Sequence, residues 1–218
     1  NQACLDHTFS MKLTSCLVNP RACRETELNY NKVPKSKKIA VVGAGPAGIS
    51  FSITAAQRGH VVSLFEESNE IGGQLNFAKM IPGKEEFHGL LNYYKNEIKR
   101  LKIDLITDHK VKTTDLINFD EIIISTGVVP RKIDIEGQDK VNFVYDYQEV
   151  FNDRVELGNK IAIIGAGGIG FDVAEYISSS GISPTLDINK WMEKWGVTDP
   201  AIERGGVLQK NEIRSDDS

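Results

Sequence analysis

Residues 39–48 read IAVVGAGPAG, and this stretch decides the fold. Four apolar residues in a row are typical of a strand that is buried on both faces. The glycines that follow predict a tight turn, and Pro46 suits the first turn of a helix, where its missing N–H costs nothing. A helix is expected over Pro46 to Arg58 and a second buried strand over Val61 to Phe65. This order of elements predicts an α/β chain with a Rossmann-like fold.

The glycines also have the spacing of a dinucleotide-binding fingerprint, in the run Gly43-Ala44-Gly45-Pro46-Ala47-Gly48. The run follows a strand and opens a helix, which is the context that the fingerprint requires. Bare glycine backbone and a helix N-terminus together can hold a pyrophosphate. Glu66 closes the next strand, 18 residues after Gly48, where a carboxylate can accept hydrogen bonds from ribose hydroxyls. The alternative is a glycine turn that binds nothing.

Two later features favour FAD as the dinucleotide. The segment Ile71-Gly72-Gly73-Gln74 begins five residues after Glu66, and Thr126-Gly127 ends a strand that is expected over Glu121 to Ser125. With the fingerprint and the acid, these features resemble the flavoproteins that have two dinucleotide-binding domains, the disulfide reductase and glutamate synthase group. The resemblance implies that the segment with Gly73 passes the pyrophosphate, and that Thr126 and Gly127 approach the cofactor from the other side. It also implies that the backbone of Val111 contacts adenine, although a plain strand residue is an equal alternative.

The same pattern recurs 122 residues later. Residues 160–164, KIAII, predict a buried strand, residues 165–170 a glycine turn, and Phe171 to Ser179 a helix. The spacing is that of a nicotinamide cofactor site, so the candidate NAD(P)H-binding residues are Gly165, Gly167 and Gly170. After Ser180 no second parallel strand is recognisable, so NADH and NADPH are not distinguished. The alternative is an incomplete half-domain that binds neither.

The remaining pattern is simpler. Apolar residues at spacings of three and four predict an amphipathic helix over Glu85 to Lys102, and a strand is expected at Ile103 to Ile106. Residues 1–38 lack such a pattern and are expected to be irregular. Near the end, Ile188, Trp191, Met192 and Trp195 predict a short amphipathic turn, in which the two tryptophans pack together.

Composition excludes several classes of protein. The chain has 26 basic and 30 acidic residues, a net charge of −4, which argues against nucleic acid as the main partner. The longest uncharged stretch, Ile39 to Gln57, contains the glycine turn and therefore does not predict a membrane-spanning helix. Three cysteines give no disulfide scaffold and, with no signal peptide, predict a cytoplasmic protein. Read alone, the cysteines are more typical of buried thiols than of ligands.

The chain as a whole resembles the bacterial NADPH-dependent 2,4-dienoyl-CoA reductases. The resemblance runs through residues 1–6, 15–23, 59–61, 71–74, 78–87, 127–131 and 169–172, and the stretch IPGKEEF at 81–87 is its most specific part. That family binds a [4Fe–4S] cluster through Cys-x2-Cys-x3-Cys-x11-Cys. The resemblance implies that Cys4 and Cys16 are the third and fourth ligands, that Cys23 is not a ligand, and that Gln74 and Lys84 lie near the flavin.

The resemblance further implies a longer parent protein with an FMN-carrying TIM barrel, a cluster segment, and an FAD domain interrupted by an NADPH domain. The domains expected in this chain are residues 1–38 with half of the cluster ligands, 39–157 for FAD, and 158–218 as an incomplete NAD(P)-binding domain. In such a parent, electrons pass from NADPH through FAD and the cluster to FMN and reduce 2,4-dienoyl-CoA in unsaturated fatty acid β-oxidation. This chain would contact the rest of the parent and, alone, is expected neither to turn over nor to assemble a cluster.

Two other functions fit the same residues. A related amine dehydrogenase or enoate reductase would share these domains and differ in the barrel. A nucleotide-binding docking module would use the glycine turns to hold an adenine nucleotide without redox turnover.

Overall fold

The computed structural model describes residues 3–131, 134–141, 143–152 and 155–207. Residues 1–2, at the start of the expected cluster segment, and 208–218, in the third expected domain, lie outside the described residues. The chain forms two compact units, one of residues 1–76 with 87–133 and one of residues 77–86 with 134–218. The boundaries of these units differ from the expected domain boundaries after residues 38 and 157. The expected domains stay predictions.

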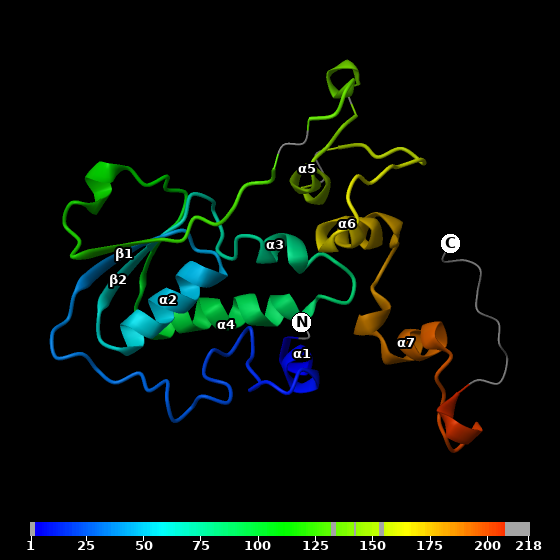
Figure 1. Ribbon diagram of the computed structural model, residues 1–218, viewed down its shortest axis with the longest axis horizontal. Coiled ribbons are helices and arrows are strands. Elements are labelled where there is room, and N and C mark those ends of the chain that lie inside the picture. Colours follow the sequence, from blue (N-terminus) through cyan, green and yellow to red (C-terminus); the bar gives the residue numbers. More distant parts are fainter. Residues whose placement is uncertain (1–2, 132–133, 142, 153–154, 208–218) are drawn as a thin grey trace. The chain divides into compact units, whose positions relative to one another are not determined.

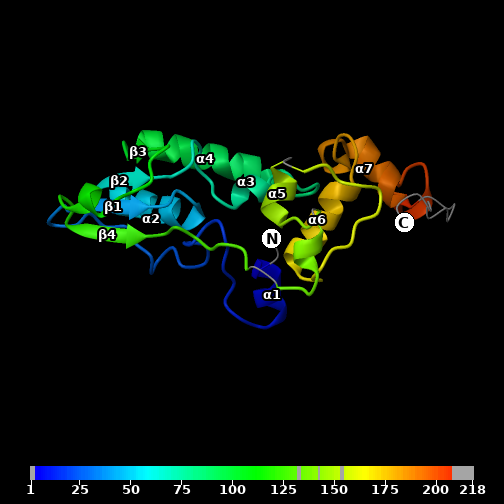
Figure 2. The ribbon, with the colours of Figure 1, turned by 90° about the horizontal axis from the view of Figure 1, so that it is seen from above.

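A four-stranded parallel sheet is the centre of the first unit. It consists of β1 (Lys38–Val42), β2 (Val61–Phe65), β3 (Asp104–Ile106) and β4 (Glu121–Ile124). The strands lie in the order β3-β2-β1-β4, which Figure 2 shows from above. Because all four strands are parallel, their carboxyl ends lie at one edge of the sheet, where ligands of open α/β sheets bind. The predicted α/β, Rossmann-like fold is confirmed.

Two helices, α2 (Pro46–Gln57) and α4 (Glu86–Arg100), pack on one face of this sheet (Figure 1). The core contains alternate strand residues, such as Val41 and Leu64, together with Ile49 of α2 and Ile98 of α4. Both helices end within two residues of their predicted positions. Apolar periodicity located α4, which buries Leu91, Tyr94 and Ile98, whereas the glycine turn and Pro46 located the start of α2.

The opposite face of the sheet is covered by the connection from β3 to β4, which includes the 3-10 turn η1 (Thr113–Leu116). The ring of Phe119 lies 6.0 Å from that of Phe65, and the ring of His109 lies 5.8 Å from it. Toward β4 the cover is incomplete, because Ile122 is 44% exposed and Ile124 is 68% exposed.

The expectation that residues 1–38 are irregular is wrong at one place. Helix α1 (Ala3–Phe9) lies in this segment, and the hydroxyl of Thr8 donates to the carbonyl of Cys4, one turn earlier. Asp6 in its first turn and His7 in its last turn complement the helix dipole, a local effect that needs no apolar periodicity. The rest of the segment, up to β1, has no regular element.

The second unit is built from short helices. They are α5 (Tyr147–Phe151), α6 (Gly168–Ser178), α7 (Ile188–Trp195) and the 3-10 turns η2 (Gln138–Lys140), η3 (Pro184–Leu186) and η4 (Arg204–Gly206). A further short helix, α3 (Leu75–Ala78), contains the boundary between the units. The predicted amphipathic turn is α7, and its tryptophan rings lie 6.3 Å apart, which confirms their packing.

The strand predicted at residues 160–164 is not formed, and α6 begins three residues before the predicted Phe171. Ile161 is 47% exposed and Ile164 is 65% exposed, although the sequence predicts a buried strand. A parallel strand exists only through backbone hydrogen bonds to a neighbouring strand. Within the described part of the second unit no such neighbour is present, so this apolar segment has no ladder to join.

Candidate dinucleotide-binding site

The turn after β1 has a backbone that only glycine can adopt easily. Gly43 has a φ of +103°, and a Cβ atom on it would lie 2.4 Å from the carbonyl oxygen of Ser125. A Cβ atom on Gly48 would lie 1.9 Å from the carbonyl oxygen of Gly43. These two glycines therefore allow α2 to approach β1 closely, which is the role of the outer glycines in a dinucleotide fingerprint.

The middle glycine leaves space instead. Gly45 is the N-cap of α2, with Pro46 directly after it, and a Cβ atom on Gly45 would meet nothing within 4 Å. The backbone N–H groups in the first turn of a helix have no partner within the helix. Bare backbone, open space and unpaired donors fit a pyrophosphate at Gly45, Pro46, Ala47 and Gly48.

The second glycine pair lies against this turn. The N–H of Gly72 donates to the carbonyl of Ala44 at 2.8 Å, and a Cβ atom on Gly73 would lie 3.2 Å from the Cα of Gly45. Gly72 has a φ of +122° and Gly73 a φ of +52°. The structure thus brings together the fingerprint turn and the second glycine pair, which the sequence analysis expected at the same pyrophosphate. Gln74 follows directly and is exposed.

Glu66, at the end of β2, reaches the same turn. Its Oε2 atom accepts from the N–H of Ala44 at 2.8 Å, and its Oε1 atom accepts from the N–H of Ser68 at 3.0 Å and the hydroxyl of Ser68 at 2.9 Å. A carboxylate has about four acceptor positions, so a ribose hydroxyl could take the one that is left or replace Ser68. Its contact with ribose stays a prediction.

The end of β4 closes the turn from the other side. The hydroxyl of Ser125 donates to the carbonyls of Val42 and Gly43, each at 2.9 Å. Thr126 follows, with its Cα 3.1 Å from the position of a Cβ atom on Gly43, and Gly127 has a φ of +76°. Sequence reasoning missed Ser125, which the position directly before Thr126 could have indicated.

Val111 lies in the loop after β3, half-buried. That loop is bound to the end of β2, because the N–H of His109 donates to the carbonyl of Glu66 at 2.9 Å and the N–H of Asp108 donates to the carbonyl of Ser68 at 2.9 Å. The structure thus places Val111 two residues from a direct contact with Glu66, and its contact with adenine stays a prediction.

The second fingerprint repeats part of the geometry of the first, although a Cβ atom on Gly165 would meet nothing within 4 Å. Gly165 has a φ of +116°, and a Cβ atom on Gly170 would lie 2.2 Å from the carbonyl oxygen of Gly165. Gly167 is the N-cap of α6, and a Cβ atom there would meet nothing within 4 Å. The turn and its helix are therefore formed although the preceding strand is not.

Lys84 pairs with α6, directly after this second turn. Its Nζ atom lies 2.5 Å from the Oδ1 atom of Asp172, with the two side chains 40% and 29% exposed. Asp172 lies one turn after the first residue of α6. Sequence reasoning gave Asp172 no role, and no local signal joins residues that lie 88 positions apart.

The neighbouring residue Glu85 forms a second link within this unit. Its Oε2 atom accepts from the hydroxyl of Thr185 at 2.9 Å. Burial raises the pKa of Glu85, but hydrogen bonds from Ser183, Thr185 and the backbone outweigh it and hold the pKa below its ordinary value. The segment around Lys84 is thus bound at two adjacent positions.

A sequence profile of the family described as pyridine nucleotide-disulphide oxidoreductase matches residues 37–202, which include both fingerprints. The chain belongs to this oxidoreductase family.

Relatives of this oxidoreductase chain include several reductases. A metal reductase of Desulforamulus reducens is 37% identical, and the match covers 86% of this chain and 28% of the reductase. A cinnamate reductase of Clostridium sporogenes is 31% identical, and the match covers 85% of this chain and 28% of that reductase. The solved structure of 2-naphthoyl-CoA reductase with 2-naphthoyl-CoA is 31% identical, with a TM-score of 0.76 over 89% of this chain and 32% of that chain. The oxidoreductase chain therefore spans about a third of the length of these relatives or less.

The cysteines of the oxidoreductase chain are all free thiols. Cys4, on α1, and Cys23 are exposed, and Cys16 is half-buried. Within the described ranges, no three His, Cys, Asp or Glu side chains are grouped so that they could hold a metal ion. The assignment of Cys4 and Cys16 as cluster ligands stays a prediction.

No helix in the described part of the oxidoreductase chain is both long enough and apolar enough to cross a bilayer.

Proposed function

We propose that this chain is the FAD- and NADPH-binding part of a longer reductase. The observation that carries the proposal is the repetition of one glycine geometry at two places, after β1 and before α6. In each, the first glycine has a positive φ, the last glycine permits close packing of the helix on the turn, and the middle one leaves backbone open to a phosphate. Two dinucleotide sites on one chain of this family fit a flavin and a nicotinamide cofactor.

In the first unit, the chain's residues would hold FAD by its pyrophosphate and ribose. The first turn of α2 would donate backbone N–H groups to the pyrophosphate, and Gly73 would leave room for it beside Gly45. Glu66 would accept from ribose, and the Val111 backbone would contact adenine. Bound FAD would supply the exchange between a hydride and single electrons.

In the second unit, the turn from Gly165 to Gly170 would bind NADPH in the same way. Lys84 forms an ion pair with Asp172, on the helix that begins in this turn. We also propose Gln74 and Lys84 as residues near the flavin, because the family resemblance implies this position for both.

For the substrate, we favour the conjugated double bond of an acyl-CoA such as 2,4-dienoyl-CoA. The support is the family resemblance together with the CoA thioester in the 31% identical solved structure. An enoate, which has no CoA, is the second candidate because a cinnamate reductase is equally similar. The parent would carry FMN and a [4Fe–4S] cluster, to which Cys4 and Cys16 would contribute two of four ligands.

Anaerobic reduction of bound flavin tests the cofactor roles. Adding NADPH to the FAD-loaded protein should bleach the flavin absorption band. Gly170→Ala should retain FAD but resist bleaching, because its Cβ would meet the Gly165 carbonyl, whereas Gly168→Ala, whose Cβ meets nothing within 4 Å, should behave like the wild type. Retention of FAD without any reduction in the wild type would instead indicate a docking module.

The coding sequence upstream of Asn1 tests the proposed cluster and barrel. We expect a Cys-x2-Cys motif directly before Asn1 and a barrel before that motif. Any other upstream sequence would contradict the proposed parent.

A further inference from the structure

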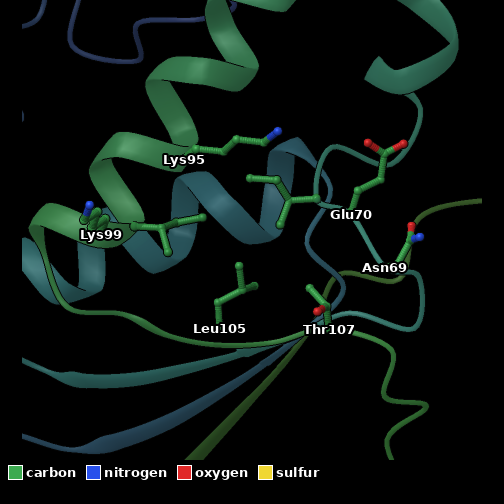
Figure 3. A pocket seen from close by; sticks show the side chains of 8 residues that line it. Asn69, Glu70, Lys95, Lys99, Leu105 and Thr107 are labelled. Carbon is green, nitrogen blue, oxygen red and sulfur yellow. The ribbon is translucent and has the colours of Figure 1, made fainter.

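The first unit contains a cavity of about 360 Å³ that is separate from the residues of the dinucleotide site (Figure 3). Its walls are the loop after β2, the last two turns of α4, and β3 with the residue that follows it. A volume of this size lies in the range of small-molecule sites, roughly 300–1,000 Å³. The wall that includes Ile71 continues directly into the glycine pair at Gly72 and Gly73.

The floor of the cavity is apolar. Ile71 and Ile98 are buried in the core, at 4% and 5% exposure, whereas Leu105 of the edge strand β3 is 37% exposed. An apolar group in the cavity would cover the open side of Leu105 and so remove apolar surface from water.

The rim carries positive charge. Lys95 and Lys99 are one turn apart on α4, on the same face of the helix, and both line the cavity, as Figure 3 shows. Like charges at this spacing repel each other. In the part of the chain that the structure describes, neither lysine has a hydrogen-bond or ion-pair partner.

The nearby carboxylates are used elsewhere. Glu97, on the same helix, is held by Arg100 through hydrogen bonds of 2.7 and 2.6 Å. Glu70, the carboxylate in the cavity wall, has an interaction of its own. The two ammonium groups thus remain available to an anion from outside the chain.

We propose that this cavity binds a small organic anion, a carboxylate attached to an apolar body. The apolar body would lie on Ile98 and Leu105, and the carboxylate would accept hydrogen bonds from Lys95 and Lys99. The hydroxyl of Thr107, also in the wall, would offer a further donor. An inorganic anion would leave the apolar floor uncovered, and a neutral ligand would leave the lysine repulsion in place.

Calorimetric titration of the 218-residue chain with three probes tests the proposal at fixed ionic strength. Benzoate combines both features, benzyl alcohol lacks the charge, and inorganic phosphate lacks the apolar body. We expect one saturable benzoate site per chain, with the other two probes at least about tenfold weaker, since a hydrogen bond to a charged group typically changes affinity by that much or more. No saturable benzoate binding, or equal binding of either other probe, would overturn the proposal.

Variants assign the binding to this cavity. The double variant Lys95→Gln and Lys99→Gln should lose benzoate binding by about tenfold or more, while its thermal unfolding midpoint stays near that of the wild type, because both are surface positions. Lys102→Gln, which removes one positive charge just after the end of α4 and outside the cavity, should bind as the wild type does. An equal loss in Lys102→Gln, or no loss in the double variant, would show that the cavity is not the site.

Discussion

Gly48 and Gly170 occupy the same position in the two fingerprints, and a Cβ atom on either would meet the carbonyl oxygen of the first glycine of its turn. The sequence could predict both residues because the close contact is local, between positions five apart. It could not predict the partners of Glu66, since a carboxylate at the end of a strand has several donors within reach. The structure shows that Ala44 and Ser68 provide them.

We expect Gly48→Ala to lose FAD binding and to destabilise the first unit by about 1–3 kcal/mol, the usual cost of overpacking. The contact at 1.9 Å is with backbone, which cannot move aside as a side chain can. Gly89→Ala on α4 is the control, because its Cβ meets nothing within 4 Å and alanine favours a helix by about 1 kcal/mol. Chemical denaturation measures the free energy of unfolding of both variants, and equal stability of the two would contradict the expectation.

Glu66→Gln should weaken FAD binding by about tenfold to a hundredfold, because charged acceptors form the stronger hydrogen bonds. Glu67→Gln is the matched control. Glu67 is exposed and forms a surface ion pair with Lys110 at 3.0 Å, so loss of its charge should change affinity little. Titration of each variant with FAD, followed by flavin fluorescence, provides the comparison. Similar affinities of the two variants for FAD would show that Glu66 does not contact the cofactor.

At the scale of elements, the sequence predicted best those that depend on their own pattern. Helices α2 and α4 and the strands of the first unit lie where periodicity placed them. The strand at 160–164 failed because its existence depends on neighbours that the described second unit does not provide. The pair between Lys84 and Asp172 could not be predicted either, since it depends on how α6 packs against a distant segment.

The packing of α5 and α6 gives a prediction for the second unit. Phe151 is 4% exposed, with its ring 5.9 Å from that of Phe77 and 4.8 Å from that of Tyr176 on α6. Phe151→Ala should cost about 3–5 kcal/mol and so weaken the support of the second fingerprint. Phe143→Ala is the control, because Phe143 is 72% exposed and should change stability by less than about 0.5 kcal/mol. Hydrogen exchange of the α6 amides reports the loss, and unchanged protection in Phe151→Ala would contradict it.

At the scale of the whole molecule, the predicted fold class is confirmed, and the chain belongs to an oxidoreductase family with reductases among its relatives. Membership of the 2,4-dienoyl-CoA reductases stays a prediction. The substrate could not be predicted from the sequence, for a physical reason. Glycine turns of this kind recognise the phosphates and ribose that all dinucleotides share. Relatives of this chain are named for the reduction of compounds as different as metals, cinnamate and naphthoyl-CoA. Substrate choice must therefore come from residues other than the two fingerprints.

The central claim is that the turn from Gly43 to Gly48 binds FAD. The most direct test is an FAD titration of the purified 218-residue chain, read by quenching of flavin fluorescence, with Gly48→Ala and Gly89→Ala in parallel. We predict saturation at one FAD per chain for the wild type and Gly89→Ala, and no saturable binding for Gly48→Ala. Absence of binding to a folded wild-type chain, or equal binding by Gly48→Ala, would contradict the claim.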